Sequence, residues 1–345
     1  MESTTLIYED IDYIHFWNIS GNMTNDMDME NYEEFLKFIS LTRIIIPVFY
    51  GLIAIFGLLG NILTIAGIQR HKTIIGITKY LITNLAITDI LYVAFGVSFK
   101  AIYPALRFWP FGDIWCRIHT YLEYVCYFAK ICTLVLMSLD RYIYLVHPIR
   151  ALMLRTKRNG YIALIALWSL VILGNIPFIF IAREVVIDEQ VKVCSIHFED
   201  PSGFATYFFL FSYLLPLIVL ILLNGHTFRV FLTGTSPTGY TNGDLIQLEV
   251  NKSVTKMVFL VVSFFAVCWM PLQVIMLYTH VSKEKHSTVS FASISYAAQC
   301  LAYMNSCINP ILYTIYTHTL RIGMALITRS AVERQDILQL AVIGN

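Results

Sequence analysis

Charged residues are scarce in this sequence. Only 14% of its 345 residues are Asp, Glu, Lys or Arg, and 57% are hydrophobic, whereas about 25% charged residues is usual in a soluble domain. The sequence also lacks the cysteine and histidine spacings of zinc sites, the glycine-rich loops that bind phosphate and the serine motif of hydrolases. We therefore expect no cofactor, no metal, no nucleic-acid partner and no catalysed covalent reaction.

Apolar segments long enough to cross a lipid bilayer recur along the chain. A helix needs about 20 residues to span the hydrocarbon core, and the segments cover residues 44–68, 80–97, 126–139, 162–181, 204–223, 257–277 and 287–316. Seven spans predict an all-α membrane domain over residues 42–316.

Basic residues between these segments predict the orientation of the chain, because Lys and Arg concentrate in cytoplasmic loops. They follow the first, third and fifth segments: Arg70, Lys72 and Lys79, then Arg141, Arg150, Arg155, Lys157 and Arg158, then Arg229, Lys252 and Lys256. We therefore expect residues 1–41 to form an extracellular acidic tail, glycosylated in the triplets at Asn18 and Asn22. Residues 317–330 have the pattern of an amphipathic helix on the membrane, and residues 331–345 are expected to be a short cytoplasmic tail.

Two of the seven cysteines fall outside the apolar segments, in positions predicted to be extracellular. The other five are interpreted as small buried hydrophobic residues. Cys116 begins the third span and Cys194 lies between the fourth and fifth spans. An oxidising compartment allows them to pair, so we expect a Cys116–Cys194 disulfide. The alternating, β-branched residues 183–196 predict a β-hairpin in this second extracellular loop.

Three ionisable residues lie along the third span. Helical steps of about 100° return Lys130 and Arg141, which follow Glu123 by 7 and 18 residues, to nearly the same side of the helix. A charge at membrane depth costs ~2.5–3.5 kcal/mol on insertion scales, so each needs a partner or a function. This arrangement is typical of a signalling or transport protein. A continuous polar path for transport is disfavoured, because residues 131–139 offer only Thr133 and Ser138.

Short motifs occur in order along residues 40–330, each within its own span. They are Gly60-Asn61, Asn84-Leu85-Ala86-Ile87-Thr88-Asp89, Asp140-Arg141-Tyr142, Trp168, Pro216, Cys268-Trp269-Met270-Pro271 and Asn309-Pro310-Ile311-Leu312-Tyr313. Together they resemble those of rhodopsin-like (class A) G-protein-coupled receptors. The stretches 109–116, 133–142, 254–258 and 302–310 are similar to those of allatostatin-A and galanin-type neuropeptide receptors.

The resemblance implies a seven-transmembrane bundle in the plasma membrane, with a short eighth helix, that couples an extracellular neuropeptide, including amidated peptides, to a heterotrimeric G protein of the Gi/o class. Arrestin is an expected further partner. The residues that match the family's switch and coupling positions are Asp140, Arg141, Tyr142, Trp269, Pro271, Phe265, Ile131, Pro216, Asn309, Pro310 and Tyr313. A retinal protein is excluded, because a Schiff base needs a lysine in the seventh span and no lysine follows Lys285.

Lys130 departs from the resemblance. Receptors of this kind often hold a sodium ion beside the aspartate of the second span, here Asp89, with a small polar residue at the position of Lys130. Asp89 and Lys130 each lie 11 residues from the expected cytoplasmic end of their span, so both reach a depth of about 16 Å in the membrane. Asn305 falls at a similar depth. We expect an internal Asp89–Lys130 ion pair whose ammonium replaces the sodium, since the free-energy cost of burying an unpaired ammonium at this depth is prohibitive. The alternative is an uncharged Lys130.

Glu123 lies two helical turns outward from Lys130, at the level of a ligand cavity. It is expected to meet a cationic group of a peptide. A biogenic amine is the rival ligand, because amine receptors carry an aspartate here, and a salt bridge to Lys100 is the structural alternative. The other residues expected to line this cavity are Phe99, Tyr103, Tyr124, Tyr127, Gln273, Met276, Tyr296, Gln299 and Tyr303. An aromatic wall suits a peptide end with apolar side chains.

Overall fold

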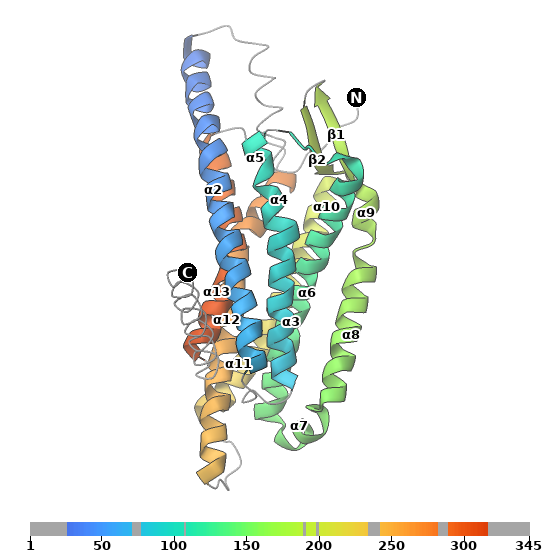
Figure 1. Cartoon of the computed structure of the whole chain (residues 1–345), viewed down its shortest axis with the longest axis vertical. Coiled ribbons are helices and arrows are strands. Elements are labelled where there is room, and N and C mark those ends of the chain that lie inside the picture. The colour runs from blue at the N-terminus through green and yellow to red at the C-terminus, as the bar shows by residue number, and fades with distance from the viewer. Residues whose placement is uncertain are drawn as a thin grey trace, which may run out of the picture.

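The computed structural model describes residues 26–70, 77–106, 108–188, 191–197, 200–233, 242–281 and 289–316. It is a bundle of long helices with a small hairpin at one end (Figure 1). The expected glycosylation sites Asn18 and Asn22, the amphipathic helix 317–330 and the tail 331–345 lie outside the described residues. The first helix begins at Asp26, within the segment 1–41 that was expected to be a tail.

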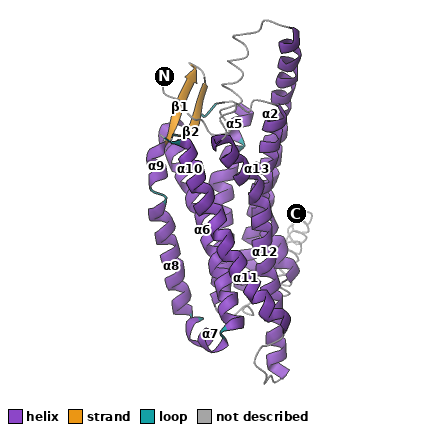
Figure 2. Ribbon diagram, turned by 180° about the vertical axis from the view of Figure 1, so that it is seen from behind, coloured by secondary structure: helices purple, strands orange, loops and turns teal. Residues whose placement is uncertain are grey.

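Fourteen helical elements make up the described part of the bundle. They are α2 (Asp26–Arg70), α3 (Ile77–Tyr92), η1 (Val93–Val97), α4 (Ser98–Lys100), α5 (Ile102–Leu106), α6 (Gly112–Val146), α7 (Pro148–Leu154), α8 (Lys157–Gly174), α9 (Pro177–Ile181), α10 (Pro201–Phe208), η2 (Phe209–Leu214), α11 (Leu215–Thr233), α12 (Asn242–Val281) and α13 (Val289–Tyr316). Figure 2 shows α8 at the edge of the bundle and α6 nearer its centre.

Within the described residues, six helical segments are long and apolar enough to cross a membrane. The seventh long helix, α13, has 28 residues and packs against α2 and α12. It is less apolar because it carries a row of buried polar side chains: Ser295, Gln299, Asn305, Ser306 and Asn309. The expected all-α bundle of seven spans is therefore confirmed, and its most polar member faces the interior.

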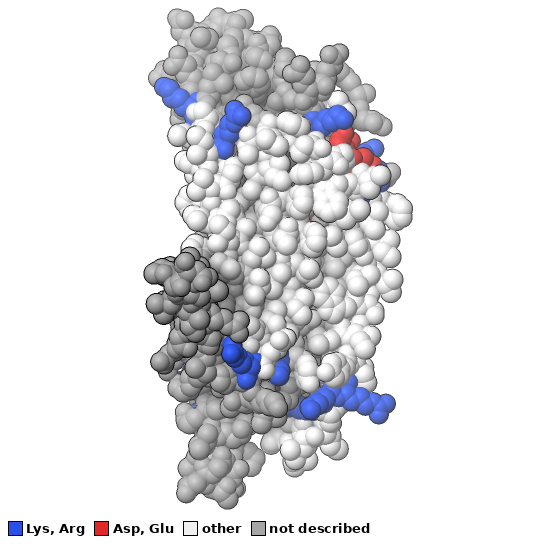
Figure 3. Space-filling view, in the orientation of Figure 1, with Lys and Arg blue, Asp and Glu red and all other residues white. Residues whose placement is uncertain are grey.

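The outer surface of the bundle matches a lipid environment. Large apolar side chains such as Ile44, Leu170 and Phe211 are more than half exposed. Figure 3 shows charged side chains gathered toward the two ends of this face, with an uncharged belt between them. A continuous exposed apolar belt of this kind indicates contact with a membrane.

The predicted hairpin is confirmed. Strand β1 (Ala182–Asp188) pairs antiparallel with β2 (Val191–Ile196), and Glu184 is the partner of Cys194 in the register. The expected disulfide joins Cys194 to Cys116 in the first turns of α6, with their Cα atoms 5.5 Å apart. The hairpin is thereby fixed at the end of the bundle where the cavity described below lies (Figure 1).

A proline motif in α13 and a Gly-Asn pair in α2 fit these two helices together. Pro310 has no N–H for the carbonyl of Ser306, four residues earlier, and the side-chain amide of Asn61 donates to that carbonyl instead, at 2.9 Å. A Cβ atom at Gly60 would lie 3.0 Å from Pro310, so glycine allows α2 and α13 to approach closely. The hydrogen bond that Pro310 removes from α13 is thus replaced by one from Asn61 of α2, and Gly60 leaves the space for this close approach.

The two π-helical turns, η1 and η2, were not predicted. Pro216 cannot donate to the carbonyl of Ser212, and the hydroxyl of Tyr127 on α6 donates to it at 3.3 Å. In η1 the hydroxyl of Ser98 donates to the carbonyl of Val93, at 2.9 Å. Such widened turns re-aim side chains and are frequent at functional sites.

Candidate functional site: a cavity, a buried ion pair and a buried arginine cluster

A cavity of about 120 Å³ lies between the helices beneath the hairpin. It is lined by Tyr92, Lys100, Glu123, Tyr124, Tyr127, Phe208, Trp269, Leu272, Gln273, Met276, Gln299 and Tyr303. The structure thus brings together Glu123, Lys100 and six of the other residues expected here, whereas Phe99 and Tyr296 do not line the cavity and the side chain of Tyr103 lies outside the described part. Tyr92, Phe208 and Leu272 were missed, and Trp269, assigned from the sequence to the switch, lines the cavity as well. Tyr92 follows Asp89 by three residues, so helical periodicity alone would have placed it on the same face of α3.

Glu123 supplies the negative charge of the cavity. Its carboxylate lies 3.7 Å from Nζ of Lys100 and 3.9 Å from Nε2 of His119. Both separations are longer than a hydrogen bond, so the carboxylate is loosely held. The side chain of Glu123 retains 16% exposure, which leaves it accessible from the cavity.

The cavity wall also carries polar atoms fixed between aromatic rings. Nε2 of Gln273 donates to the hydroxyl of Tyr127 at 2.9 Å, and Oε1 of Gln299 accepts from Tyr50 at 2.9 Å. Oε1 of Gln273 and Nε1 of Trp269 are buried without a hydrogen-bond partner in the described part of the chain. Two residues of the wall therefore each carry one buried polar atom, an acceptor on Gln273 and a donor on Trp269, whose hydrogen-bonding capacity is unused.

Below the cavity, Lys130 and Asp89 are in contact. Nζ of Lys130 lies 2.6 Å from Oδ1 of Asp89 and donates to Oγ of Ser306 at 2.8 Å. Ser306 donates to Oδ1 of Asp89 at 2.9 Å, and Asn309 donates to Oδ2 at 2.7 Å. Lys130 is 1% exposed and Asp89 is fully buried.

The seventh-helix partners of this ion pair are Ser306 and Asn309, and Asn305, the neighbour of Ser306, is not one of them. Asn305 is buried at 1% exposure, and its Nδ2 has no partner among the described residues. Depth along the helix is similar for Asn305 and Ser306, but of these two only Ser306 faces Asp89. These residues do not fit a sodium ion, because the ammonium already occupies the cation position beside Asp89.

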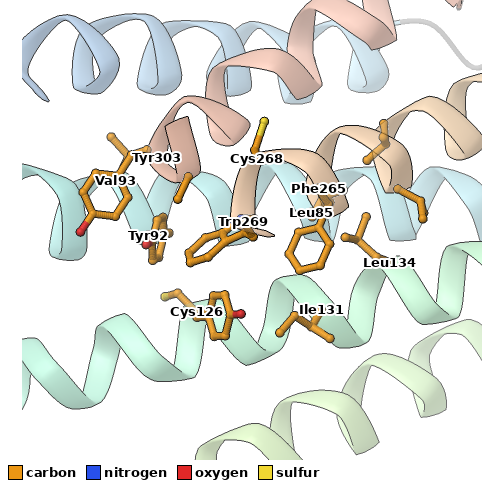
Figure 4. Close-up of a cluster of buried hydrophobic side chains, with 14 of the residues drawn as sticks. Leu85, Tyr92, Val93, Cys126, Ile131, Leu134, Phe265, Cys268, Trp269 and Tyr303 are labelled. Carbon is orange, nitrogen blue, oxygen red and sulfur yellow. The ribbon is translucent and has the colours of Figure 1, made fainter. Parts of the chain in front are cut away.

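A packed apolar layer separates the cavity from the end of the bundle opposite the hairpin. Ile131 is 3% exposed and Phe265 is fully buried, and the ring of Phe265 lies 6.2 Å from that of Trp269. Figure 4 shows Phe265 and Trp269 side by side on α12, facing Ile131 and Cys126 of α6. Movement of one of these side chains obliges the others to repack, since the layer is dense.

Asp140 and Arg141 form the centre of a buried cluster near the C-terminal end of α6. Arg141 donates through Nε to Asp140 at 3.1 Å and through Nη2 to Asp140 and Thr78. Arg155, in the linker after α7, donates to the other carboxylate oxygen of Asp140 at 2.7 Å. One carboxylate therefore holds two guanidinium groups. The role of Arg155 was missed, because a loop arginine gives no sequence signal beyond its charge.

The remaining motif residues lie around this cluster. The ring of Tyr142 lies 5.6 Å from His147 and 5.5 Å from His226. Tyr313 on α13 is fully buried, and its hydroxyl has no partner in the described residues. The motifs thus fall at three levels: cavity, ion pair and arginine cluster.

Residues 60–313 match the family described as 7 transmembrane receptor (rhodopsin family). The chain belongs to this family. It is therefore a multi-pass membrane receptor rather than an enzyme, and the narrower resemblance to neuropeptide receptors is also confirmed. An allatostatin-A receptor from Bombyx mori is 35% identical over 88% of this chain and 84% of its own length.

Other relatives are also receptors named for peptides. A galanin receptor type 2 from Rattus norvegicus is 29% identical over 81% of this chain and 74% of its own length. A somatostatin receptor type 5 from Bos taurus is 31% identical over the same shares. The three levels of motif residues in this rhodopsin-family receptor therefore lie on a scaffold that it shares with peptide receptors.

Proposed function

We propose that this receptor binds an extracellular neuropeptide at the plasma membrane and promotes nucleotide exchange on a heterotrimeric G protein of the Gi/o class. One observation carries the proposal: the cavity combines a loosely held carboxylate, Glu123, with a largely aromatic wall. The relatives named for allatostatin-A, galanin and somatostatin support a peptide ligand.

The chemistry of the cavity selects the part of the peptide that enters it. Glu123 attracts a cationic group, and Tyr124, Tyr127 and Tyr303 offer apolar ring surface to a hydrophobic side chain. A peptide end bears both features, as well as amide groups that pair with Gln273. Amidated peptides of the allatostatin or galanin kind fit these requirements.

The cytoplasmic end supplies the coupling surface. Basic residues concentrate in the loops at that end, which supports an extracellular N-terminus. Arg141 is held inward by Asp140 and Thr78. In the signalling state Arg141 leaves this contact and takes part in binding the G protein, and arrestin competes for the same face.

The Asp89–Lys130 pair takes the place that sodium has in many relatives. Its ammonium is tethered to α6 and does not exchange with solvent. The resting structure is thereby stabilised by a charge that is independent of the salt around the cell.

Ligand binding and G-protein coupling are linked through the populations of the resting and signalling conformations of the bundle. A peptide shifts the equilibrium only as far as its affinities for the two states differ. The layer of Ile131, Phe265 and Trp269 joins the cavity to the cytoplasmic half and is the packing element that this shift rearranges.

A biogenic-amine receptor that uses Glu123 as the amine counter-ion is the rival function. It is not favoured, because the most similar relatives are named for peptides.

The test is a cell-based G-protein activation screen. Allatostatin-A, galanin and somatostatin peptides, each amidated and with a free carboxylate, are compared with monoamines on cells that express the receptor and on matched cells that lack it. We expect activation by one peptide class, blocked by pertussis toxin. Activation by a monoamine and by no peptide would reject the proposal.

A further inference from the structure

Tyr92 belongs both to the ligand cavity and to the surroundings of the buried lysine. It lines the cavity, and its ring centroid lies 5.1 Å from Nζ of Lys130. It ends α3, one turn after Asp89 and directly before the π turn η1. Figure 4 shows its ring beside Trp269 and near Tyr303.

The ammonium of Lys130 has three N–H donors. Asp89 and Ser306 accept two of them, at 2.6 and 2.8 Å. No third oxygen or nitrogen acceptor lies within hydrogen-bond distance among the described residues. The ring of Tyr92 is within the about 6 Å range of a cation–π contact, so its face is the third partner of the ammonium.

The remaining surface of Tyr92 belongs to the cavity. Its ring lies 6.1 Å from Trp269 and 6.0 Å from Tyr303, both of which line the cavity. Its hydroxyl makes no hydrogen bond within the part of the chain that the structure describes. The hydroxyl is therefore available to a polar group of a ligand in the cavity.

We propose that Tyr92 is the positioning residue through which an occupied cavity acts on the Asp89–Lys130 ion pair. A ligand that turns the ring removes the third partner of the ammonium and so destabilises the resting ion pair. By linkage, the ion pair affects ligand affinity by the same factor. The contact with Lys130 stands without any ligand, and only the effect of ligands rests on the proposed function.

A double-mutant cycle on thermal stability tests the contact. The melting temperature of the purified, ligand-free receptor is measured for wild type, Tyr92→Leu, Lys130→Met and the double variant. We expect Tyr92→Leu to lower it by about 2–4 °C more in the Lys130 background than in the Lys130→Met background. Tyr92→Phe, which keeps the ring, should melt within about 1 °C of wild type.

The matched control is Tyr124→Leu, which removes a cavity tyrosine whose ring packs on Phe178 and Phe208 rather than on Tyr92. It should shift the melting temperature equally in both backgrounds. Equal shifts for Tyr92→Leu as well would overturn the proposal. If Tyr92→Leu folds only in the Lys130→Met background, the result supports the proposal. If it fails to fold in both backgrounds, the result counts against the proposal, because the ring would then be needed for folding even without the ammonium.

The ligand arm uses the allatostatin-A peptide as probe. Tyr92→Phe should raise its half-maximal concentration for G-protein activation by about 3–10-fold, the loss expected of one hydrogen bond, with the melting temperature unchanged. An unchanged potency would contradict the ligand part of the proposal. If no peptide activates the wild-type receptor, the proposed function fails, and the stability cycle still decides whether Tyr92 supports Lys130.

Discussion

Nζ of Lys130 lies 2.6 Å from Oδ1 of Asp89 at the centre of the bundle, and both side chains are excluded from solvent. The contact joins α6 to α3, and Ser306 joins both to α13. A buried pair of this kind adds little net stability relative to apolar packing, but removing one partner is costly. Its value here is to fix one arrangement of three helices.

Sodium should have no specific effect on ligand affinity. Because the ammonium of Lys130 occupies the cation position, affinity of an activating peptide should be equal in NaCl and in KCl of the same ionic strength. Lys130→Ser opens that position and should create a loss of affinity in NaCl. A sodium-induced loss in wild type that Lys130→Ser removes would contradict this account.

Neutralising one partner of the ion pair should destabilise the receptor strongly. Asp89→Asn leaves a buried ammonium without a counter-charge, which costs about 3–5 kcal/mol and should lower the melting temperature by about 10 °C. Adding Lys130→Met removes the unpaired charge and should recover most of the loss. Thermal denaturation of the purified variants measures both, and a double variant no better than Asp89→Asn would argue against the pair.

Glu123 and Lys100 should affect peptide binding in opposite directions. Glu123→Gln removes the attraction for a cationic ligand group and should weaken binding by about 10–100-fold. Lys100→Met releases the carboxylate from its competitor at 3.7 Å and should leave binding unchanged or tighter. If the pair instead serves only the internal salt bridge, competition binding will show equal and small effects for both variants.

Asp140 should restrain the receptor in the absence of ligand. Asp140→Asn removes the charge that holds Arg141 and Arg155, so basal nucleotide exchange should rise several-fold. Arg155→Ala leaves the Arg141 contact and should raise it less. Lys157→Ala is the control, since Lys157 makes no ion pair within the described residues. Basal exchange that stays at the wild-type level in Asp140→Asn would contradict the restraint.

Most of the architecture was predictable from local patterns. Apolar runs predicted the spans, alternating β-branched residues predicted the hairpin, and the positions of Cys116 and Cys194 predicted the disulfide. Spacing along single helices also placed Lys130 level with Asp89. These features depend on length, periodicity and depth, which a sequence contains directly.

The contacts that the sequence did not predict depend on how one helix is rotated against another. Ser306 rather than Asn305 faces Asp89, and Arg155 reaches Asp140 from a linker. The π turns arise where a tertiary partner, such as the hydroxyl of Tyr127, satisfies a released carbonyl. The helical start at Asp26 also extends beyond the apolar pattern, because a helix continues past the residues that contact lipid.

The central claim is that peptide binding in the cavity opens the cytoplasmic arginine cluster to a G protein. It is tested most directly by the rate of nucleotide exchange on a purified Gi/o heterotrimer, with the receptor reconstituted in lipid vesicles and the allatostatin-A, galanin and somatostatin peptides added in turn. The account predicts that at least one peptide accelerates exchange with wild-type receptor. With Arg141→Ala, the same peptide should bind without accelerating exchange. Acceleration that persists in Arg141→Ala, or no acceleration of the wild-type receptor by any of the peptides, would contradict it.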